Sequence, residues 1–565
     1  MRRGARLFST VLVYSALRVL GLRKTAHARQ RAQGSEQEKH NRKLAKLPQE
    51  KTRGLRMANI SEKASGANAQ TGANAQSTAT AQTKQVTNTE PANNQEHLKK
   101  GLQNRHIQLI ALGGAIGTGL FYGSAESIQL AGPSILLTYL LGGALIFLIV
   151  RALGEMSTYD PKAGAFSYYA SHYWSKRAGF VSGWNYWANY LLVSMVELAV
   201  VGQFVQYWFP AIPAWVSAAV FMVLITAANM LGVKAFGEFE FWFAIIKIVA
   251  VIAMIIVGIA VIFMAIPGTD GAIPGLHNLA NFFPNGFFTA HHAAGSGAAG
   301  AAGGVTYSGV LMALVVVMFS FGGTELIGIT AGEAEDPKKS IPKATNEVVW
   351  RILLFYVVAL FVIMCVVPWD KIGVPNKNGV VVSPFVQIFD SVGIQFAAGL
   401  LNFVCLTAVI SVYNSALYSN SRMLYSLALQ GNAPAYLSKT NKRGVPHWGV
   451  LTSAAITVIA VVVVFLWPEF AFNYLMSIAT FSGILNWSLI AITQMKFRKF
   501  IGADGEKDLT FKLPLAKITP WIILIAMFAI YALMWLSPSY RVAAWLGPIW
   551  CVVLVVAYEI TQRFK

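Results

Sequence analysis

The sequence predicts an all-α membrane protein with twelve transmembrane helices, and its composition and hydropathy support this fold class. Of the 565 residues, 55% are hydrophobic and only 12% are charged, which is too apolar for an ordinary soluble domain. From residue 107 onward, apolar stretches of about 20 residues recur, and this length crosses the hydrocarbon core of a bilayer. The twelve predicted spans are residues 107–129, 133–153, 178–208, 213–232, 240–266, 306–331, 347–368, 393–424, 448–467, 471–495, 518–537 and 543–562.

Basic residues alternate between successive loops and so orient the predicted spans. Lysines and arginines precede span one and follow spans two, four, six, eight and ten, whereas the loops 130–133, 209–213 and 267–305 contain none. Because loops rich in lysine and arginine stay in the cytoplasm, we expect both termini to be cytoplasmic. The exceptions to the alternation are Lys371, Lys377 and Arg541.

The first 98 residues differ from the rest of the chain in composition. Residues 1–56 hold fifteen lysines and arginines against three glutamates, and the later stretch "SGANAQTGANAQSTATAQTKQ" is polar and of low complexity. Such a segment buries too little apolar surface to fold. We therefore expect residues 1–98 to form a disordered extension and residues 99–565 to form the membrane domain. An alternative places the start of translation at Met57.

The net charge of +20 does not indicate nucleic-acid binding. A surplus of twelve positive charges lies in residues 1–56, and the remainder lies mostly in the loops predicted to be cytoplasmic. This distribution is typical of membrane topology and of contact with anionic lipids.

Glycine interrupts two of the predicted spans. "GGAIGTGLF" (residues 113–121) places four glycines within seven residues of span one, and "MFSFGGTELIG" places Gly322 and Gly323 in span six. Unpaired backbone groups survive at membrane depth only where protein or water covers them. Interruptions in the first and sixth spans predict an inverted repeat of five plus five helices, with spans eleven and twelve appended.

The interrupted backbone favours a binding site for a small zwitterion. Unwound segments offer amide groups to an anion and carbonyl groups to a cation, which suits an amino acid. The alternative for span one is close helix packing, because Gly113 and Gly117 form a GxxxG pattern. The pairing of two interruptions favours the binding site.

Six stretches of the predicted membrane domain carry a family pattern. They are "NRHIQLIALGGAIGTGLFYGSA", "AGPSILLTYLLGG", "RALGEM", "FGEFEFWFAIIKI", "GITAGEAEDPKKSIPKA" and "SVYNSALYSNSRMLYSLALQGNAP". Together they resemble the amino acid transporter family of bacterial permeases, within the amino acid–polyamine–organocation superfamily. The resemblance runs from about Lys99 to the C-terminus, and it is strongest to the aromatic amino acid and phenylalanine permeases. The N-terminal extension departs from the family pattern.

This resemblance implies a LeuT-like fold with discontinuous helices 1 and 6 that works by alternating access. It also implies proton symport of an L-amino acid across the bacterial cytoplasmic (inner) membrane. Phe319 matches an aromatic gate over the substrate, although Phe321 is an alternative for that role. The residues that the resemblance places against the substrate are Ile116, Gly117, Thr118, Gly119, Phe319, Ser320 and Gly322.

An ionisable side chain within a membrane span is expensive to keep there and therefore indicates function. Lys247 lies about two turns into span five, and a desolvated lysine can lose its proton near neutral pH, as a proton carrier must. In proton-coupled relatives, a lysine at the matching position takes the place of a sodium ion. The alternative is that Lys247 extends to the cytoplasmic edge of the membrane.

Five further charged residues are candidates for supporting roles. Glu325 follows the interruption of span six and would relay a proton or bond the unwound backbone. Glu126 and Glu197 are weaker candidates for gating or helix pairing. Arg151 and Glu155, at the inner end of span two, would form a cytoplasmic gate or anchor a loop, and we favour the anchor.

The predicted activity is proton-driven import of aromatic or other large neutral L-amino acids, without a cofactor. A permease of the same fold for proline, histidine or small neutral amino acids is the near alternative, and a membrane amino acid sensor is a more distant one. No H-E-x-x-H sequence, catalytic carboxylate pair or nucleophile with an adjacent base indicates an enzyme. The expected partners are the amino acid, protons and membrane lipids, but not nucleic acid. The residues predict no metal site and no particular oligomeric state.

Overall fold

The computed structural model describes residues 103, 105, 106, 108, 109, 116–162, 164–269, 271, 273–280, 308–374, 381–468 and 470–563. The predicted extension of residues 1–98 and the glycine pair Gly113 and Gly114 lie outside the described residues. Within the described part of the chain the regular structure is helical, and it includes no β-strand. The all-helical fold class is therefore confirmed for these residues.

Nine helical stretches in the described part of the chain are long and apolar enough to cross a membrane. Two further apolar helices are shorter, namely α10 (Ala214–Asn229) and α13 (Ser308–Ser320). The nine stretches are Gly123–Tyr159, Lys176–Gln206, Val233–Phe263, Pro337–Val366, Gln395–Leu429, His447–Leu466, Ala471–Lys507, Thr519–Leu536 and Pro538–Arg563.

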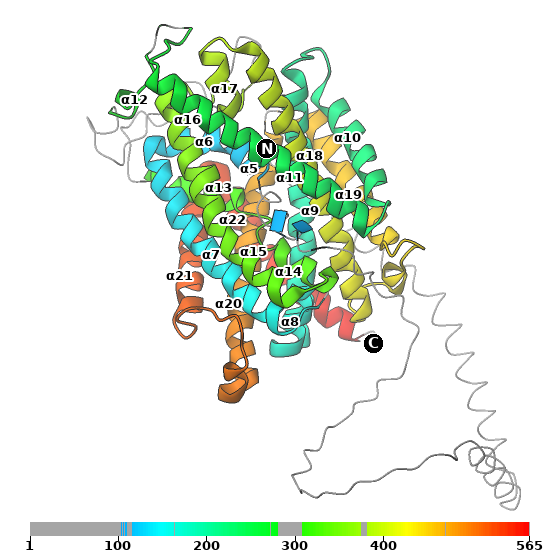
Figure 1. Ribbon diagram of the computed structural model, residues 1–565. Coiled ribbons are helices and arrows are strands. Elements are labelled where there is room, and N and C mark those ends of the chain that lie inside the picture. Colours follow the sequence, from blue (N-terminus) through cyan, green and yellow to red (C-terminus); the bar gives the residue numbers. More distant parts are fainter. Residues whose placement is uncertain are drawn as a thin grey trace, which may run out of the picture. The chain divides into compact units, whose positions relative to one another are not determined.

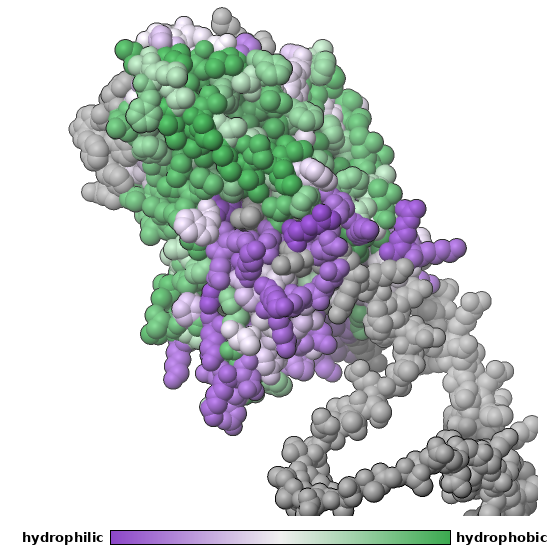
Figure 2. Space-filling model, viewed as in Figure 1, coloured by the Kyte–Doolittle hydropathy of each residue, from purple (hydrophilic) through white to green (hydrophobic). Residues whose placement is uncertain are grey.

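Hydrophobic and hydrophilic residues separate on the surface. Hydrophobic residues cover the upper part of the face seen in Figure 2, and hydrophilic residues gather below them. Figure 1 places α8 (Ala165–Tyr169) and α14 (Leu326–Thr330) at that lower end. A continuous apolar surface of this kind suits a helix bundle whose sides face lipid.

Several helices extend further than their predicted spans. α11 (Val233–Phe263) begins before predicted span 240–266, and α20 (Ala471–Lys507) continues beyond predicted span 471–495. The added turns carry charged residues such as Glu238. Hydropathy detects only the apolar part of a helix, whereas its backbone hydrogen bonds continue into the aqueous region.

The first interruption precedes α5 (Thr118–Phe121). Gly117 has extended backbone (φ −144°, ψ −148°), so the helix begins only at Thr118. α6 (Gly123–Ala131) follows and ends at Gly132, whose φ of 54° favours glycine. Pro133 then opens a 3₁₀ turn before α7 (Ile135–Tyr159). The apolar stretch from Gly123 to Tyr159 is therefore broken at Gly132.

The second interruption lies between α13, which ends at Ser320, and α14. The intervening residues form successive turns, in which the amide of Gly322 donates to the carbonyl of Phe319 at 2.9 Å and that of Leu326 donates to Gly323 at 3.1 Å. Gly323 has a φ of 95°, a conformation that side chains other than glycine rarely adopt. The glycines predicted to interrupt span six thus lie where the helix stops.

Three long helices form the interior around these interruptions. α9 (Lys176–Gln206) packs against both α18 (Gln395–Leu429) and α20, and α5 contacts α9, α13 and α18. The outer helices α11, α19 (His447–Leu466), α21 (Thr519–Leu536) and α22 (Pro538–Arg563) expose large apolar side chains such as those of Phe465 and Val552. This arrangement encloses polar residues of the interior helices and leaves apolar ones toward lipid.

Candidate functional site

A cavity lies where the two interruptions meet α9, α18 and α20. Its free volume is about 30 Å³, which holds roughly two water molecules. Ile116 is buried beside Gly117 but does not line the cavity. The other six residues predicted to contact the substrate all line it, namely Gly117, Thr118, Gly119, Phe319, Ser320 and Gly322.

The two interruptions touch each other directly. The Ser320 hydroxyl donates to the carbonyl of Gly119 at 2.8 Å. A Cβ atom on Gly119 would lie 2.5 Å from the Ser320 Cα atom, so only glycine allows this approach. The Tyr356 hydroxyl donates to the Ser320 carbonyl at 3.0 Å and satisfies a carbonyl at the end of α13.

Glu197 on α9 holds the first interruption from the side. The Thr118 hydroxyl donates to Glu197 Oε2, and both side chains are buried. Glu197 also lines the cavity. The sequence predicted a gating or pairing role for this residue, and the structure places it against the candidate substrate site.

Lys247 lies at the centre of a buried polar cluster. Its side chain is fully buried, so the alternative that it reaches the cytoplasmic edge is wrong. Lys247 Nζ donates to the Ser411 hydroxyl at 2.9 Å, and Ser411 donates to Glu240 Oε2 at 2.6 Å. Asn414 Nδ2 donates to Glu240 Oε1 at 2.7 Å. A buried cation and carboxylate thus share one hydroxyl, and their charges compensate each other.

The cluster around Lys247 is linked to the cavity through two helices. Glu240 and Glu197 both act electrostatically on the Lys247 ammonium group, and Glu197 bonds Thr118. Val412, the residue after Ser411 on α18, lines the cavity itself. The charge on Lys247 therefore acts on groups at the candidate substrate site.

Glu325 occupies the second interruption, immediately before α14. Its carboxylate is buried and accepts hydrogen bonds from Tyr190 and Thr324, each at 3.3 Å. Tyr190 belongs to α9, so Glu325 ties the unwound turn to that helix. Glu126 has a comparable contact farther along α6, where it accepts a hydrogen bond from Tyr540 of α22 at 2.9 Å.

Sequence reasoning missed several residues that line the cavity. On α9 they are Asn189 and Val193, which precede Glu197 at intervals of four residues. On α20 they are Ala479, Thr480, Gly483 and Trp487. The spacing of eight residues between Asn189 and Glu197, two steps of four, is the one sequence signal that could have identified Asn189, because residues four apart share a helix face.

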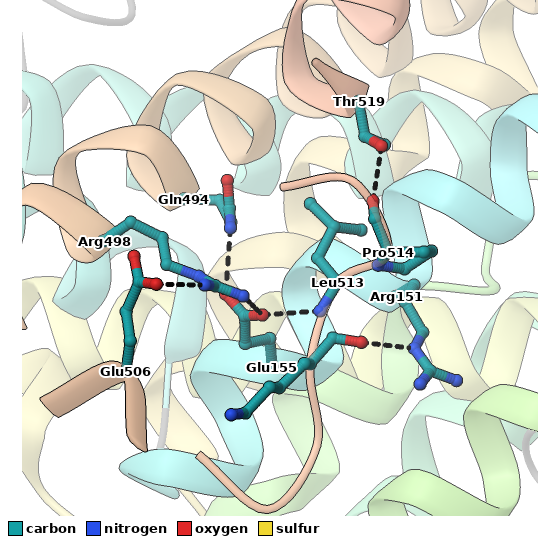
Figure 3. A network of polar contacts seen from close by, with 9 residues as sticks. Arg151, Glu155, Gln494, Arg498, Glu506, Leu513, Pro514 and Thr519 are labelled. Carbon is teal, nitrogen blue, oxygen red and sulfur yellow. Dashed lines mark hydrogen bonds and ion pairs between the residues drawn. The ribbon is translucent and has the colours of Figure 1, made fainter. Parts of the chain in front are cut away.

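A network at the hydrophilic end fixes the segment between α20 and α21 to α7 (Figure 3). Glu155 accepts hydrogen bonds from Gln494 at 2.9 Å, from Arg498 and from the backbone amide of Leu513. Arg151 donates to the Lys512 carbonyl at 3.0 Å. These contacts are those of the loop anchor that the sequence analysis favours.

The residues before the first interruption are held by α11. Arg105 forms an ion pair with Glu238 at 2.8 Å, and the ring of His106 lies 3.2 Å from the same carboxylate. Burial lowers the pKa of His106, and the neighbouring Glu238 carboxylate partly offsets that effect. Among the residues that the structure describes, no group of three or more histidine, cysteine, aspartate or glutamate residues is arranged to hold a metal ion.

Comparisons with known proteins identify the family. Residues 106–565 match the family model described as amino acid permease. The aromatic amino acid transport protein AroP of Escherichia coli (strain K12) is 47% identical over 470 residues, which are 83% of this chain and 96% of that protein. The uncharacterized amino acid permease YtnA of Bacillus subtilis (strain 168) is 44% identical over 467 residues, 82% of this chain and 95% of that protein. The chain thus belongs to the amino acid permease family and is a multi-pass membrane protein of amino acid transport.

Proposed function

We propose that this protein imports aromatic L-amino acids across the bacterial inner membrane by proton symport. The observation that carries the proposal is the cavity between two interrupted helices, whose lining includes Gly117, Thr118, Gly119, Phe319, Ser320 and Gly322. The relative AroP is named as an aromatic amino acid transport protein. Phe319 and Trp487 add aromatic surfaces to the cavity, which suit a planar apolar side chain.

The proposed architecture is twelve spans with a LeuT-like inverted repeat of five plus five helices. The nine candidate spans, the shorter helices α10 and α13, and the break at Gly132 support this number. In this arrangement α5 with α6, and α13 with α14, are the discontinuous helices 1 and 6. We assign residues 99–565 to the permease domain and residues 1–98 to an N-terminal extension. The alternation of basic loops supports cytoplasmic termini.

The substrate's charged groups bind the interrupted backbone. The carboxylate and the amino group contact the six predicted residues that line the cavity, and the Phe319 ring closes over the ligand as a gate. The present cavity holds only about 30 Å³ of free volume, roughly two water molecules. An amino acid therefore enters only when lining groups move, which fits an alternating-access cycle with an occluded state.

The contacts of Lys247 support the proposed proton coupling. When Lys247 loses its proton, Glu240 and Glu197 lose a compensating charge within a poorly solvated interior. Glu197 holds Thr118 beside the substrate site. The change in charge therefore alters how Thr118 is held at the first interruption. In this proposal Glu325 supports the second interruption through Tyr190 and is available as a second proton relay.

Uptake of radiolabelled phenylalanine in cells expressing the full chain tests the proposal. A panel of the twenty amino acids as competitors defines the substrate class, and a protonophore defines the coupling. We expect tyrosine and tryptophan to block uptake and the protonophore to abolish accumulation. Competition by proline, histidine or small neutral amino acids instead would contradict the aromatic preference, and accumulation that resists the protonophore would contradict proton coupling.

A further inference from the structure

Asn189 lines the cavity, and its side chain carries a buried, unpaired amide oxygen. The residue lies near the middle of α9, and only 4% of its surface is exposed. None of the residues that the structure describes donates a hydrogen bond to Asn189 Oδ1. A buried acceptor without a donor costs free energy, so its retention beside a cavity points to a ligand that supplies the donor.

Gly483 and Trp487 shape the space in front of this oxygen. A Cβ atom built on Gly483 would lie 3.8 Å from Asn189 Oδ1 and 3.7 Å from the Trp487 ring atom Cη2. These are ordinary van der Waals distances, so the absence of a side chain at Gly483 leaves room for about one methyl group at this point. The space is bounded by an amide oxygen on one side and an indole ring on the other.

Asn189 and Glu197 both lie on α9, and both line the cavity. The eight residues between their positions correspond to about 12 Å along the helix axis. Glu197 bonds Thr118 at the interrupted backbone, where the charged groups of the substrate bind in the proposed function. An extended aromatic amino acid held there directs the far edge of its ring toward Asn189.

We propose that Asn189 is a specificity-determining residue that recognises the polar atom on the ring of an aromatic substrate. Its Oδ1 accepts a hydrogen bond from the phenol O–H of tyrosine or the indole N–H of tryptophan, while the ring packs against Trp487 above Gly483. Phenylalanine supplies no donor and leaves the amide oxygen unpaired, which disfavours it. This inference rests on the proposed function and specifies the substrates within it.

The test compares half-saturation concentrations for uptake of tyrosine, tryptophan and phenylalanine by the full chain and its variants. Asn189→Leu keeps the approximate shape of the side chain and removes the acceptor. We expect this variant to raise the half-saturation concentrations for tyrosine and tryptophan by about tenfold relative to that for phenylalanine. Asn420→Leu is the matched control, because Asn420 is also a fully buried, unpaired asparagine but does not line the cavity.

A second variant tests the inference independently, in case Asn189→Leu misfolds. Gly483→Ala adds a methyl group at ordinary contact distance, so it narrows the space before Asn189 Oδ1 without a clash. We expect Gly483→Ala to impair the uptake of tyrosine and tryptophan more than the uptake of phenylalanine. Unchanged ratios among the three substrates in both variants, or the same shift in Asn420→Leu, would overturn the inference while leaving the proposed function intact. Absence of aromatic uptake by the unaltered chain would overturn both.

Discussion

Gly119 shows at the scale of one residue why the interrupted helices need glycine. Its carbonyl accepts the Ser320 hydroxyl, and its missing side chain lets the backbones of the two interruptions meet. The constraint is steric, because Gly119 lies in α5 and needs no unusual φ. A change of one methyl group at this point alters the distance between the two segments that line the cavity.

Gly119→Ala should therefore reduce uptake strongly. The new Cβ would lie 2.5 Å from backbone Cα of Ser320, which cannot rotate away, and overpacking of this kind costs about 1–3 kcal/mol. Gly123→Ala is the matched control, because its Cβ meets Val316 at 3.5 Å, an ordinary contact. The test measures uptake and surface expression of both variants. Wild-type uptake by Gly119→Ala would contradict the expectation.

Lys247 is a second position at which one side chain determines the expected outcome. Lys247→Ala removes the cation that compensates Glu240 through Ser411. We expect the variant to equilibrate substrate across the membrane without concentrating it, because the proton no longer drives the cycle. Lys234→Ala, on the same helix but exposed, should accumulate substrate normally. Full concentrative uptake by Lys247→Ala would exclude Lys247 as the coupling residue.

At the scale of elements, the anchor between α7 and the segment after α20 determines how that segment is held. Glu155 accepts four hydrogen bonds from three residues, and its side chain is buried. Arg498 also contacts Glu506 at 3.2 Å. The carboxylate of Glu155 therefore joins α7, α20 and the backbone of Leu513 at one point (Figure 3).

Glu155→Ala should loosen the segment 508–518. Hydrogen bonds to a charged group contribute about 1.5–3 kcal/mol each in favourable cases, and removal of Glu155 leaves the Leu513 amide unpaired. We expect faster amide hydrogen exchange in this segment and a lower Tm of the purified protein. Glu506→Ala should change either quantity little, because that side chain is 44% exposed and exposed ion pairs are weak. Equal exchange in both variants would exclude the anchor.

At the scale of the whole molecule, the proposed alternating-access cycle requires the narrow cavity to open. The cavity is bounded by residues from α5, α9, α13, α18 and α20, so its opening involves several helices together. In the proposed function, substrate binding shifts the balance between conformations with different access.

Val193→Cys reports this rearrangement. Val193 lines the cavity from α9, so we expect a cysteine there to react with a membrane-impermeant thiol reagent during transport and to be protected by bound substrate. A cysteine in place of Val223, which is 62% exposed on the outer apolar face of α10, should be unreactive in a membrane with or without substrate. Equal labelling of Val193→Cys with and without substrate would contradict a cavity that opens during transport and that the substrate occupies.

Much of the architecture follows from the sequence alone. Apolar stretches of bilayer length established a helical membrane protein, and the glycines at 117, 322 and 323 marked where the helical backbone is interrupted. Lys247 stood out because a charge within an apolar stretch is costly. These features are local in the chain, and each depends on the physical chemistry of a few neighbouring residues.

The tertiary structure alone decided which side chains share the cavity and which partners the buried charges have. Ser411 and Glu240 lie 171 residues apart in the chain. Asn189 of α9 lies close to Gly483 of α20. Hydropathy could not orient these helices, because lipid and the protein interior are equally apolar and leave no periodic signal that separates them. Packing between distant helices therefore decides the candidate site, whereas the local sequence decides where the membrane helices run and where they break.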